Sequence, residues 1–450
     1  MLPAPTSATR NGIFVIVQCQ MLGRGGVVPA PLRRPVFRLL WVGWSISYAG
    51  DALQLLAQTW LIALLTNSAL AVAGSPALAS LPLVLLPLGG VIADAYDRRR
   101  LLLLVQLIGA VAAGVVALLV ATHHIAVWHI YVWVVFASLL RVVARPTYKV
   151  LLTEVVPTGE ARSALALSSM TETGSMVLVT GLGALFLSAV GLTAAFVANA
   201  LTYVVAACAL WYHRGIGTSR PAIARLSARS AVDDLRAGFR YLRGNRWLLS
   251  PLVLTFAFVL ATSPLFTLLA AVVHAQGRTL VDLGLLAAAT SFGTFLGAAY
   301  AGMRRPGENE TLRYAQLGLV GAAALGVFAL VPIGWFSVAP LAVVGAIFGA
   351  ETVWNASRVA EFGDAVFHGR LQAITTMVLG LGAALAALWA GPVLDAFGLR
   401  SLVGAAIGLA LASGVATLAT VRRRRPAEVS GSRARVPAGG SPRRGRPADR

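Results

Sequence analysis

Apolar residues recur along this chain in runs that are long enough to cross a lipid bilayer. Each run from Phe37 onward is close to the roughly 20 residues that a spanning helix needs, and short polar segments separate the runs. The predicted spans are 37–65, 70–93, 101–121, 127–154, 163–187, 190–212, 247–273, 280–303, 311–332, 335–357, 368–390 and 395–421. The pattern predicts an all-α polytopic membrane protein with about 12 transmembrane helices.

The spans fall into two groups of six, separated by a long basic segment. This spacing predicts an N-terminal six-helix half at 37–212, a cytoplasmic linker at 213–246 and a C-terminal six-helix half at 247–421. Shifting the chain by 210 residues places Arg141 on Glu351 and Glu154 on Asp364. We therefore expect two pseudo-symmetric halves with a site between them, which is a known plan of transporters.

The segments outside the spans have their own patterns. In the linker, apolar residues at helical spacing predict a short amphipathic helix on the membrane surface, and they are Val232, Leu235, Phe239 and Leu242. Residues 1–36 and 422–450 are rich in Pro, Gly and Arg, so we expect a disordered N-terminal segment and a disordered basic tail.

Composition supports the membrane interpretation. Hydrophobic residues make up 58% of the chain and charged residues only 12%, whereas a soluble domain carries roughly 25% charged residues. One core cannot hide this much apolar surface, so most of it must face lipid. Usage that favours Ala, Gly and Arg, with Lys149 as the single lysine, suggests a GC-rich bacterial genome. Two cysteines argue against a disulfide framework.

The formal charge of +20 is distributed unevenly over the two sides of the predicted bundle. Almost every basic residue falls in the termini, the linker or the loops on their side, while the opposite loops hold only Arg278 and Arg400. Under the positive-inside rule both termini and the linker are cytoplasmic, in a bacterial inner (plasma) membrane. A basic surface used for topology in this way excludes nucleic acid as the expected partner.

A loop motif lies between the second and third spans. It reads Gly89-Gly90-Val91-Ile92-Ala93-Asp94-Ala95-Tyr96-Asp97-Arg98-Arg99-Arg100. This sequence resembles the loop signature of the major facilitator superfamily. Further blocks, at 37–51, 145–157 and 234–249, look like the export branch that includes enterobactin exporters and macrolide efflux proteins. The resemblance covers roughly residues 37–421 and implies alternating access between two halves.

The resemblance also implies a cytoplasmic gate made by Gly90, Asp94, Asp97, Arg98, Arg99 and Glu154. Gly90 is expected to let two helices approach closely. Asp94 is expected to fasten against the eleventh span, and Arg98 to pair with Asp94 and with Glu154. The chain departs from the superfamily pattern at Ala95 and Asp97. The alternative is that this cluster only fixes the topology of the loop.

Among the ionisable residues inside predicted spans, four stand out, namely Asp51, Arg141, Glu172 and Glu351. Such groups are costly in a membrane unless they are paired or face water, so they are candidates for proton coupling or substrate binding. Asp51, beside Gly50, has helix packing as its structural alternative. Arg141 and Glu351 are expected at similar depth across the cavity, either as a proton-coupling device or as a plain buried ion pair. Glu172 either faces the cavity or lies near the cytoplasmic end.

No nucleotide-binding, hydrolase or metal-site motif is present in the sequence, so we expect no enzyme activity, no cofactor and no metal. Energy then comes from an ion gradient or from the gradient of the substrate. The leading hypothesis is a monomeric, proton-coupled exporter of small amphipathic compounds such as drugs or secondary metabolites. The Gly-Pro motif of superfamily antiporters is missing from the fifth span, where Gly181-Leu182-Gly183-Ala184 stands instead. Uptake or exchange of a small metabolite, and a transport-inactive membrane scaffold, remain as alternatives.

Overall fold

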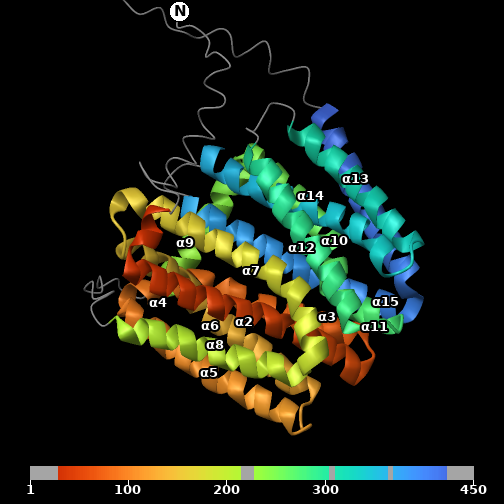
Figure 1. Cartoon of the computed structure of the whole chain (residues 1–450). Helices are drawn as coiled ribbons and strands as arrows, with labels where there is room; N and C mark the ends of the chain where they lie inside the picture. Colours follow the sequence, from red (N-terminus) through yellow and green to blue (C-terminus); the bar gives the residue numbers. More distant parts are fainter. Residues whose placement is uncertain (1–28, 214–227, 304–309, 363–367, 423–450) are drawn as a thin grey trace, which may run out of the picture.

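A computed structural model describes residues 29–213, 228–303, 310–362 and 368–422, and these residues are almost entirely α-helical with no strand among them (Figure 1). The predicted disorder of 1–28 and of the tail after residue 422 lies outside the described residues. Residues 30–36 depart from the expectation for 1–36. They form the short 3-10 helix η1 (Ala30–Arg33) and the start of α2, and Arg34 forms an ion pair with Glu160 at 3.0 Å.

The N-terminal half contains six spans, as predicted. Its helices are α2 (Pro35–Thr66), α3 (Ala69–Ser80), α4 (Leu86–Ala95), α5 (Arg98–Ala121), α6 (Val127–Glu154), α7 (Ala161–Val190) and α8 (Leu192–Tyr212). The second span is broken into α3, the 3-10 turn η2 (Leu81–Leu85) and α4. Pro82 and Pro87 account for the break, because proline lacks the N–H that an α-helix interior requires.

The linker and the C-terminal half continue the pattern. The linker contains α9 (Ala228–Gly244), the amphipathic helix that the apolar spacing predicts. The following helices are α10 (Arg246–Thr267), α11 (Leu269–Ala275), α12 (Leu280–Met303), α13 (Glu310–Leu330), α14 (Trp335–Phe362) and α15 (His368–Arg422). Within α15 the backbone leaves the helical region at Gly398 (φ 77°, ψ −179°), a conformation open to glycine, so α15 supplies the last two spans.

Six helices in the described part are long and apolar enough to cross a membrane by themselves, and a seventh is the bent pair α10–α11, which turns by 45°. The 3-10 turn η2 divides the second span, and Asp51, Gln54 and Gln58 lower the hydropathy of α2. Together the elements form two six-helix halves, which is the architecture predicted from the sequence.

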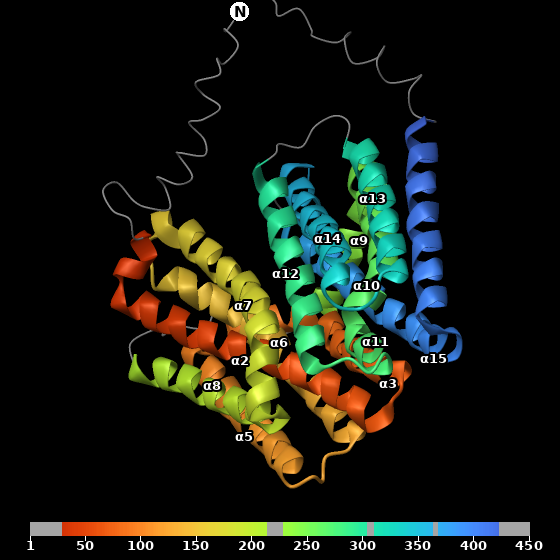
Figure 2. The same ribbon diagram turned by 45° about the vertical axis from the view of Figure 1, so that its right-hand side comes forward.

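The bundle has two ends that differ in charge. We call the end that holds the start of α2, Arg98–Arg100 and α9 the basic end, and the end that holds Asn67, Gly191 and Gly398 the opposite end. Between the halves, α3 packs on α15, α7 on α12, and α2 on α11. Figure 2 shows the two halves meeting near the opposite end and diverging toward the basic end.

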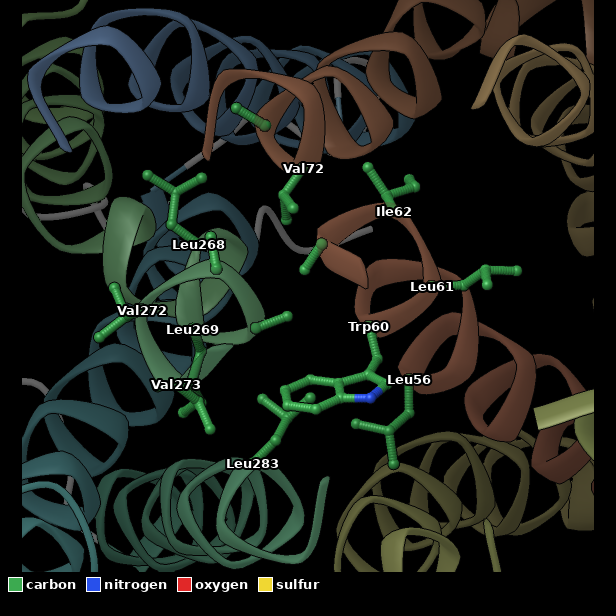
Figure 3. Packing of buried hydrophobic residues seen from close by; sticks show 14 of the residues in the cluster. Leu56, Trp60, Leu61, Ile62, Val72, Leu268, Leu269, Val272, Val273 and Leu283 are labelled. Carbon is green, nitrogen blue, oxygen red and sulfur yellow. The ribbon is translucent and has the colours of Figure 1, made fainter. Parts of the chain in front are cut away.

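The apolar core shows the same asymmetry. One continuous buried cluster includes residues of both halves at the opposite end, among them Trp60, Val72, Leu268 and Leu283 (Figure 3). At the basic end the described buried residues separate into one cluster of the N-terminal half, around Leu102 and Leu151, and others of the C-terminal half or linker. Among the described residues, the buried clusters that join the two halves therefore lie at the opposite end, and those at the basic end do not cross between the halves.

A close helix crossing positions α14 in the C-terminal half. A Cβ atom added at Gly297 of α12 would lie 1.8 Å from the Ala346 carbonyl oxygen, and one added at Gly349 of α14 would lie 2.0 Å from the Thr294 carbonyl oxygen. Each helix thus presents glycine where the backbone of the other passes, which allows the close approach that Gly-xxx-Gly pairs give to membrane helices. Glu351 follows Gly349 by two residues, so this crossing fixes its position.

Candidate transport site and gates

A pocket lies in the N-terminal half near the middle of the helices. It is formed by α2, α5, α6 and α8, and its lining residues are Trp44, Ser47, Tyr48, Asp51, Val105, Gln106, Leu140, Arg141, Ala144, Arg145 and Tyr203. Two of the four charged residues singled out from the sequence, Asp51 and Arg141, therefore lie in one pocket. Arg145, Tyr48 and Tyr203 were not expected there.

Asp51 is held by side chains of α8. Its Oδ1 accepts a hydrogen bond from the Tyr203 hydroxyl at 2.8 Å and one from Asn199 Nδ2 at 3.3 Å. Asn199, which is buried, also donates to Gln54 Oε1. Gly50 permits this arrangement, because a Cβ there would lie 2.2 Å from Thr202 Oγ1. Asp51 thus belongs to a polar network that joins α2 to α8, and Gly50 lets the two helices approach.

Arg141 and Arg145 lie one turn apart on the same face of α6. Arg145 donates to the Tyr48 hydroxyl at 2.5 Å, and its guanidinium carbon lies 5.7 Å from the centre of the Tyr48 ring. Neither arginine has a carboxylate within 4.0 Å among the described residues, and Arg141 has no hydrogen bond there. Both positive charges therefore face the pocket without an ion-pair partner in the described part of the chain.

The structure does not bring Glu351 and Glu172 into this pocket. Glu351 lies on α14, is 3% exposed, and forms no ion pair with Arg141 in the described part of the chain. Glu172 lies on α7, is half-buried, and acts electrostatically on Arg145 and Tyr48. The pseudo-symmetric relation of Arg141 and Glu351 is thus one of similar position in two halves and not of contact.

The loop motif forms a set of local anchors at the basic end. Arg98 forms an ion pair with Glu154, as the resemblance implied. Asp97 caps the start of α5 by accepting from the Arg100 N–H at 2.7 Å. Arg99 donates to the carbonyl oxygens of Leu210 and Trp211 at 2.7 and 3.1 Å, which satisfies acceptors at the end of α8. These contacts join α5, α6 and α8 within one half.

In this structure the close helix approach in the motif lies at Gly89 and not at Gly90. A Cβ at Gly90 would meet nothing within 4 Å, whereas one at Gly89 would lie 2.1 Å from the carbonyl oxygen of Val142 on α6. The crossing glycine is therefore the preceding residue of the pair. The backbone of Asp94 ends α4, and the expected contacts of its side chain lie outside the described residues.

A polar contact that the sequence analysis missed joins the two halves at the opposite end. Asp395 of α15 accepts hydrogen bonds from the backbone N–H groups of Ala69 at 2.7 Å and Leu70 at 3.0 Å, and from the Ser68 hydroxyl at 2.8 Å. The carboxylate thus caps the N-terminus of α3, where a negative charge is stabilised by the helix dipole. We call this contact the Asp395 latch.

Two neighbouring features support the latch. A Cβ at Gly391 would lie 2.7 Å from the Leu70 Cα, so glycine is what lets α15 lie against α3. On the other side of the interface, His274 Nε2 lies 2.7 Å from Asn67 Oδ1, and the His274 ring meets Trp60 edge-on at 5.5 Å. The opposite end is therefore closed by polar contacts as well as by the shared core.

A sequence signal for the latch was present. Gly90-Val91-Ile92-Ala93-Asp94-Ala95-Tyr96 and Gly391-Pro392-Val393-Leu394-Asp395-Ala396-Phe397 share the pattern Gly, three residues, Asp, Ala and an aromatic residue. The first copy ends α4 at the basic end and the second lies at the opposite end, one in each half. A search for the loop motif at both ends would have found Asp395.

This fold and site define a class of protein: a polytopic helical transporter of two six-helix halves. The sequence matches the family model described as "Transmembrane secretion effector" over residues 27–439. The chain belongs to this family of the major facilitator superfamily. No curated protein matches the sequence.

Solved structures agree with the fold. The chain is similar to the nucleoside transporter NupG (D323A mutant), with TM-score 0.69, 10% identity and coverage of 85% of this chain and 99% of that one. It is also similar to a bacterial homolog of the human lysosomal transporter Spinster in an inward-facing, unoccupied conformation, with TM-score 0.62, 16% identity, and 88% and 95% coverage. The xylose transporter XylE from E. coli, partially occluded and inward open, gives TM-score 0.60, 13% identity, and 87% and 98% coverage. Identities this low establish the fold alone.

Proposed function

We propose that this chain is a secondary active transporter that exports small amphipathic organic compounds from the cytoplasm, by proton antiport through alternating access. The observation that carries the proposal is the division of the core. Both halves share one buried cluster at the opposite end and have separate clusters at the basic end. Such a molecule can alternate between a state that is closed at the opposite end and a state that is closed at the basic end.

The direction and the sidedness rest on further arguments. The basic end faces the cytoplasm in this proposal, because arginines gather there and the positive-inside rule holds for short loops. In this conformation a substrate can then enter from the cytoplasmic side of a bacterial plasma membrane. The family description as a secretion effector supports export rather than uptake.

Two gates belong to the proposal. The Asp395 latch holds the opposite end closed and must break when the external side opens. The loop motif with Asp94, Arg98 and Glu154 then closes the basic end. Because the two motifs have the same pattern in different halves and at different ends, each half contributes an aspartate to one gate.

The charged residues divide between two tasks. The pocket with Asp51, Arg141 and Arg145 binds substrate, because Asp51 and Arg141 lie near the middle of α2 and α6. Glu351 is the first candidate for proton coupling, since it is a carboxyl buried inside a span of the other half. Glu172 is a second candidate beside the pocket.

Export of labelled amphipathic compounds from cells that express the chain tests this function, with and without a protonophore. We expect export that the protonophore abolishes and that requires Asp51. Import of a compound down its gradient would instead support the uptake alternative. Equal accumulation with and without the protein, for every compound, together with tolerance of Asp94→Asn in the chain's cellular role, would support the scaffold.

A further inference from the structure

We infer that the pocket in the N-terminal half recognises an anionic group, such as a carboxylate or a sulfonate, on an aromatic or apolar substrate. This inference rests on the proposed transport function and adds the charge of the substrate to it. Its basis is an excess of hydrogen-bond donors over acceptors in the pocket among the described residues.

The two arginines supply the positive charge. Arg141 and Arg145 line the pocket from successive turns of α6, and neither has a carboxylate within 4.0 Å among the described residues. Arg145 is exposed and Arg141 is half-buried, so a solute can reach both, and the planar fork of donors of a guanidinium matches the geometry of a carboxylate. Arg145 has only the neutral Tyr48 hydroxyl as a hydrogen-bond partner in the described part.

The acid in the pocket does not neutralise them. Asp51 Oδ1 accepts from Tyr203 and Asn199, both on α8, so the aspartate is held on the side of α8 and away from an ion pair with α6. Glu172 of α7 acts electrostatically on Arg145, but no ion pair joins the two. Both acids stay outside ion-pair distance, and the arginine donors remain open to a ligand.

Trp44 adds a neutral donor and an aromatic wall. It lines the pocket and stacks on Tyr148, with ring centres 3.9 Å apart and planes at 6°. Its indole N–H is buried and has no hydrogen-bond partner among the described residues. Buried donors in native proteins are nearly always satisfied, so an unsatisfied one that lines a pocket indicates a ligand or water. A ligand with an anionic end and an aromatic body suits this combination.

Binding of three probes with one fluorophore tests the inference on the purified full chain in phosphatidylcholine nanodiscs. Dansylglycine is an anion, dansylamide is neutral and dansylcadaverine is a cation. We expect dansylglycine to bind at least about tenfold more tightly than the other two, because hydrogen bonds to charged groups are the strong ones. Equal or tighter binding of dansylcadaverine, or no binding of dansylglycine at millimolar concentration, would overturn the inference.

Variants of α6 assign the effect to the pocket. Arg141→Gln and Arg145→Gln are expected to lower dansylglycine affinity about tenfold or more, and Arg141→Lys to have an intermediate effect. Lys149→Gln is the matched control, because Lys149 is exposed one turn beyond Arg145 and does not line the pocket. Affinity that falls equally in Lys149→Gln would show a general charge effect and contradict the assignment. Arg141→Lys keeps the test valid if a glutamine variant does not fold.

Two further arms separate other sources of failure. An anionic lipid headgroup shares the chemistry of a soluble anion, so the titration is repeated with phosphatidylglycerol in the nanodiscs. Loss of dansylglycine binding there would assign the site to lipid and overturn the substrate assignment. Export of dansylcadaverine without dansylglycine binding would refute the anion inference and leave the transport function standing. Selective dansylglycine binding without transport of any compound would support the anion inference and contradict the transport function.

Discussion

The carboxylate of Asp395 accepts a hydrogen bond from the backbone N–H of Ala69 at 2.7 Å, across 326 positions of sequence. This contact joins the last part of the C-terminal half to the second span of the N-terminal half. Because the same carboxylate also binds Leu70 N–H and the Ser68 hydroxyl, it holds three donors at the start of α3. We therefore expect the conformational equilibrium of the halves to depend on this one negative charge.

Asp395→Asn is expected to favour the state that is open at the opposite end. The amide keeps the shape but loses the charge, which weakens the latch by about 1 to 2 kcal/mol and changes the ratio of the two states roughly fivefold to thirtyfold. Spin labels at Thr122 and Leu330, in a background without Cys19 and Cys208, report the separation of the halves by double electron–electron resonance.

Asp282→Asn is the control for this experiment. Asp282 accepts from Thr279 N–H and from the Thr279 hydroxyl, so it is an acid at the same end that caps its own helix. Its neutralisation should leave the distance distribution unchanged. If Asp395→Asn also leaves the distance distribution unchanged, then the latch does not set the equilibrium between the two conformations.

Gly391→Val is expected to exclude the conformation described here. Its Cβ would lie 2.7 Å from the Leu70 Cα, a backbone atom that cannot move away without separating α15 from α3. Export should fall strongly, and the labelled ends should move apart. Gly408→Val places the same side chain in the same α15 with nothing within 4 Å of its Cβ, and it should transport normally. Equal activity of the two variants would contradict the close packing.

Asp51→Asn is expected to leave the fold intact, because the amide oxygen still accepts from Tyr203. It is expected to lower export at least about tenfold, because without this negative charge the two arginines hold an anionic substrate more tightly and release it more slowly. Asp282→Asn is a matched control, because Asp282 accepts from Thr279 at the start of α12, away from the pocket and the loop motif. Export rates and thermal stability in detergent measure the two effects. Wild-type export by Asp51→Asn would remove Asp51 from the site.

The Arg98–Glu154 ion pair is expected to affect transport more than stability. The pair is partly exposed, with side-chain exposures of 16% and 26%, so Arg98→Gln should cost about 1 kcal/mol or less. Its contribution to the gate should appear in the export rate, and the exchanged pair Arg98→Glu with Glu154→Arg should recover part of it.

Arg34→Gln is the comparison for that pair. The hydrogen bond to Glu160 raises the pKa of Arg34, so this ion pair is also present at neutral pH, but it joins η1 to the start of α7 outside the loop motif. Arg34→Gln should leave the export rate unchanged. A loss of export equal to that of Arg98→Gln would show that any ion pair at this end has the same effect.

The sequence was sufficient for the spans, because runs of apolar residues and the prolines and glycines between them act locally. It also gave the Arg98–Glu154 pair, which a family resemblance places in two neighbouring spans. It did not give the polar network of Asp51, because the partners Tyr203 and Asn199 lie about 150 positions away on another helix. The spacing of apolar residues shows which face of a helix is buried, but it does not show which other helix packs on that face.

The pairing of Arg141 with Glu351 illustrates the same limit. A shift of 210 residues correctly relates α6 to α14, but equivalent positions in two halves need not touch. In the structure Arg141 lines a pocket with Asp51 and Arg145, and Glu351 is buried beside the crossing of α12 and α14. To predict whether Arg141 and Glu351 touch, one must know how the two halves are oriented relative to each other, and no local sequence pattern contains that information.

The central claim is proton-coupled transport by this chain alone, and proton counterflow in proteoliposomes tests it most directly. The purified protein is reconstituted with a pH-sensitive dye inside the vesicles, and a gradient of an exported compound is imposed. We predict proton movement opposite to the compound in the wild type, and none in Glu351→Gln. Movement of the compound without protons in the wild type, or equal proton movement in Glu351→Gln, would contradict the account.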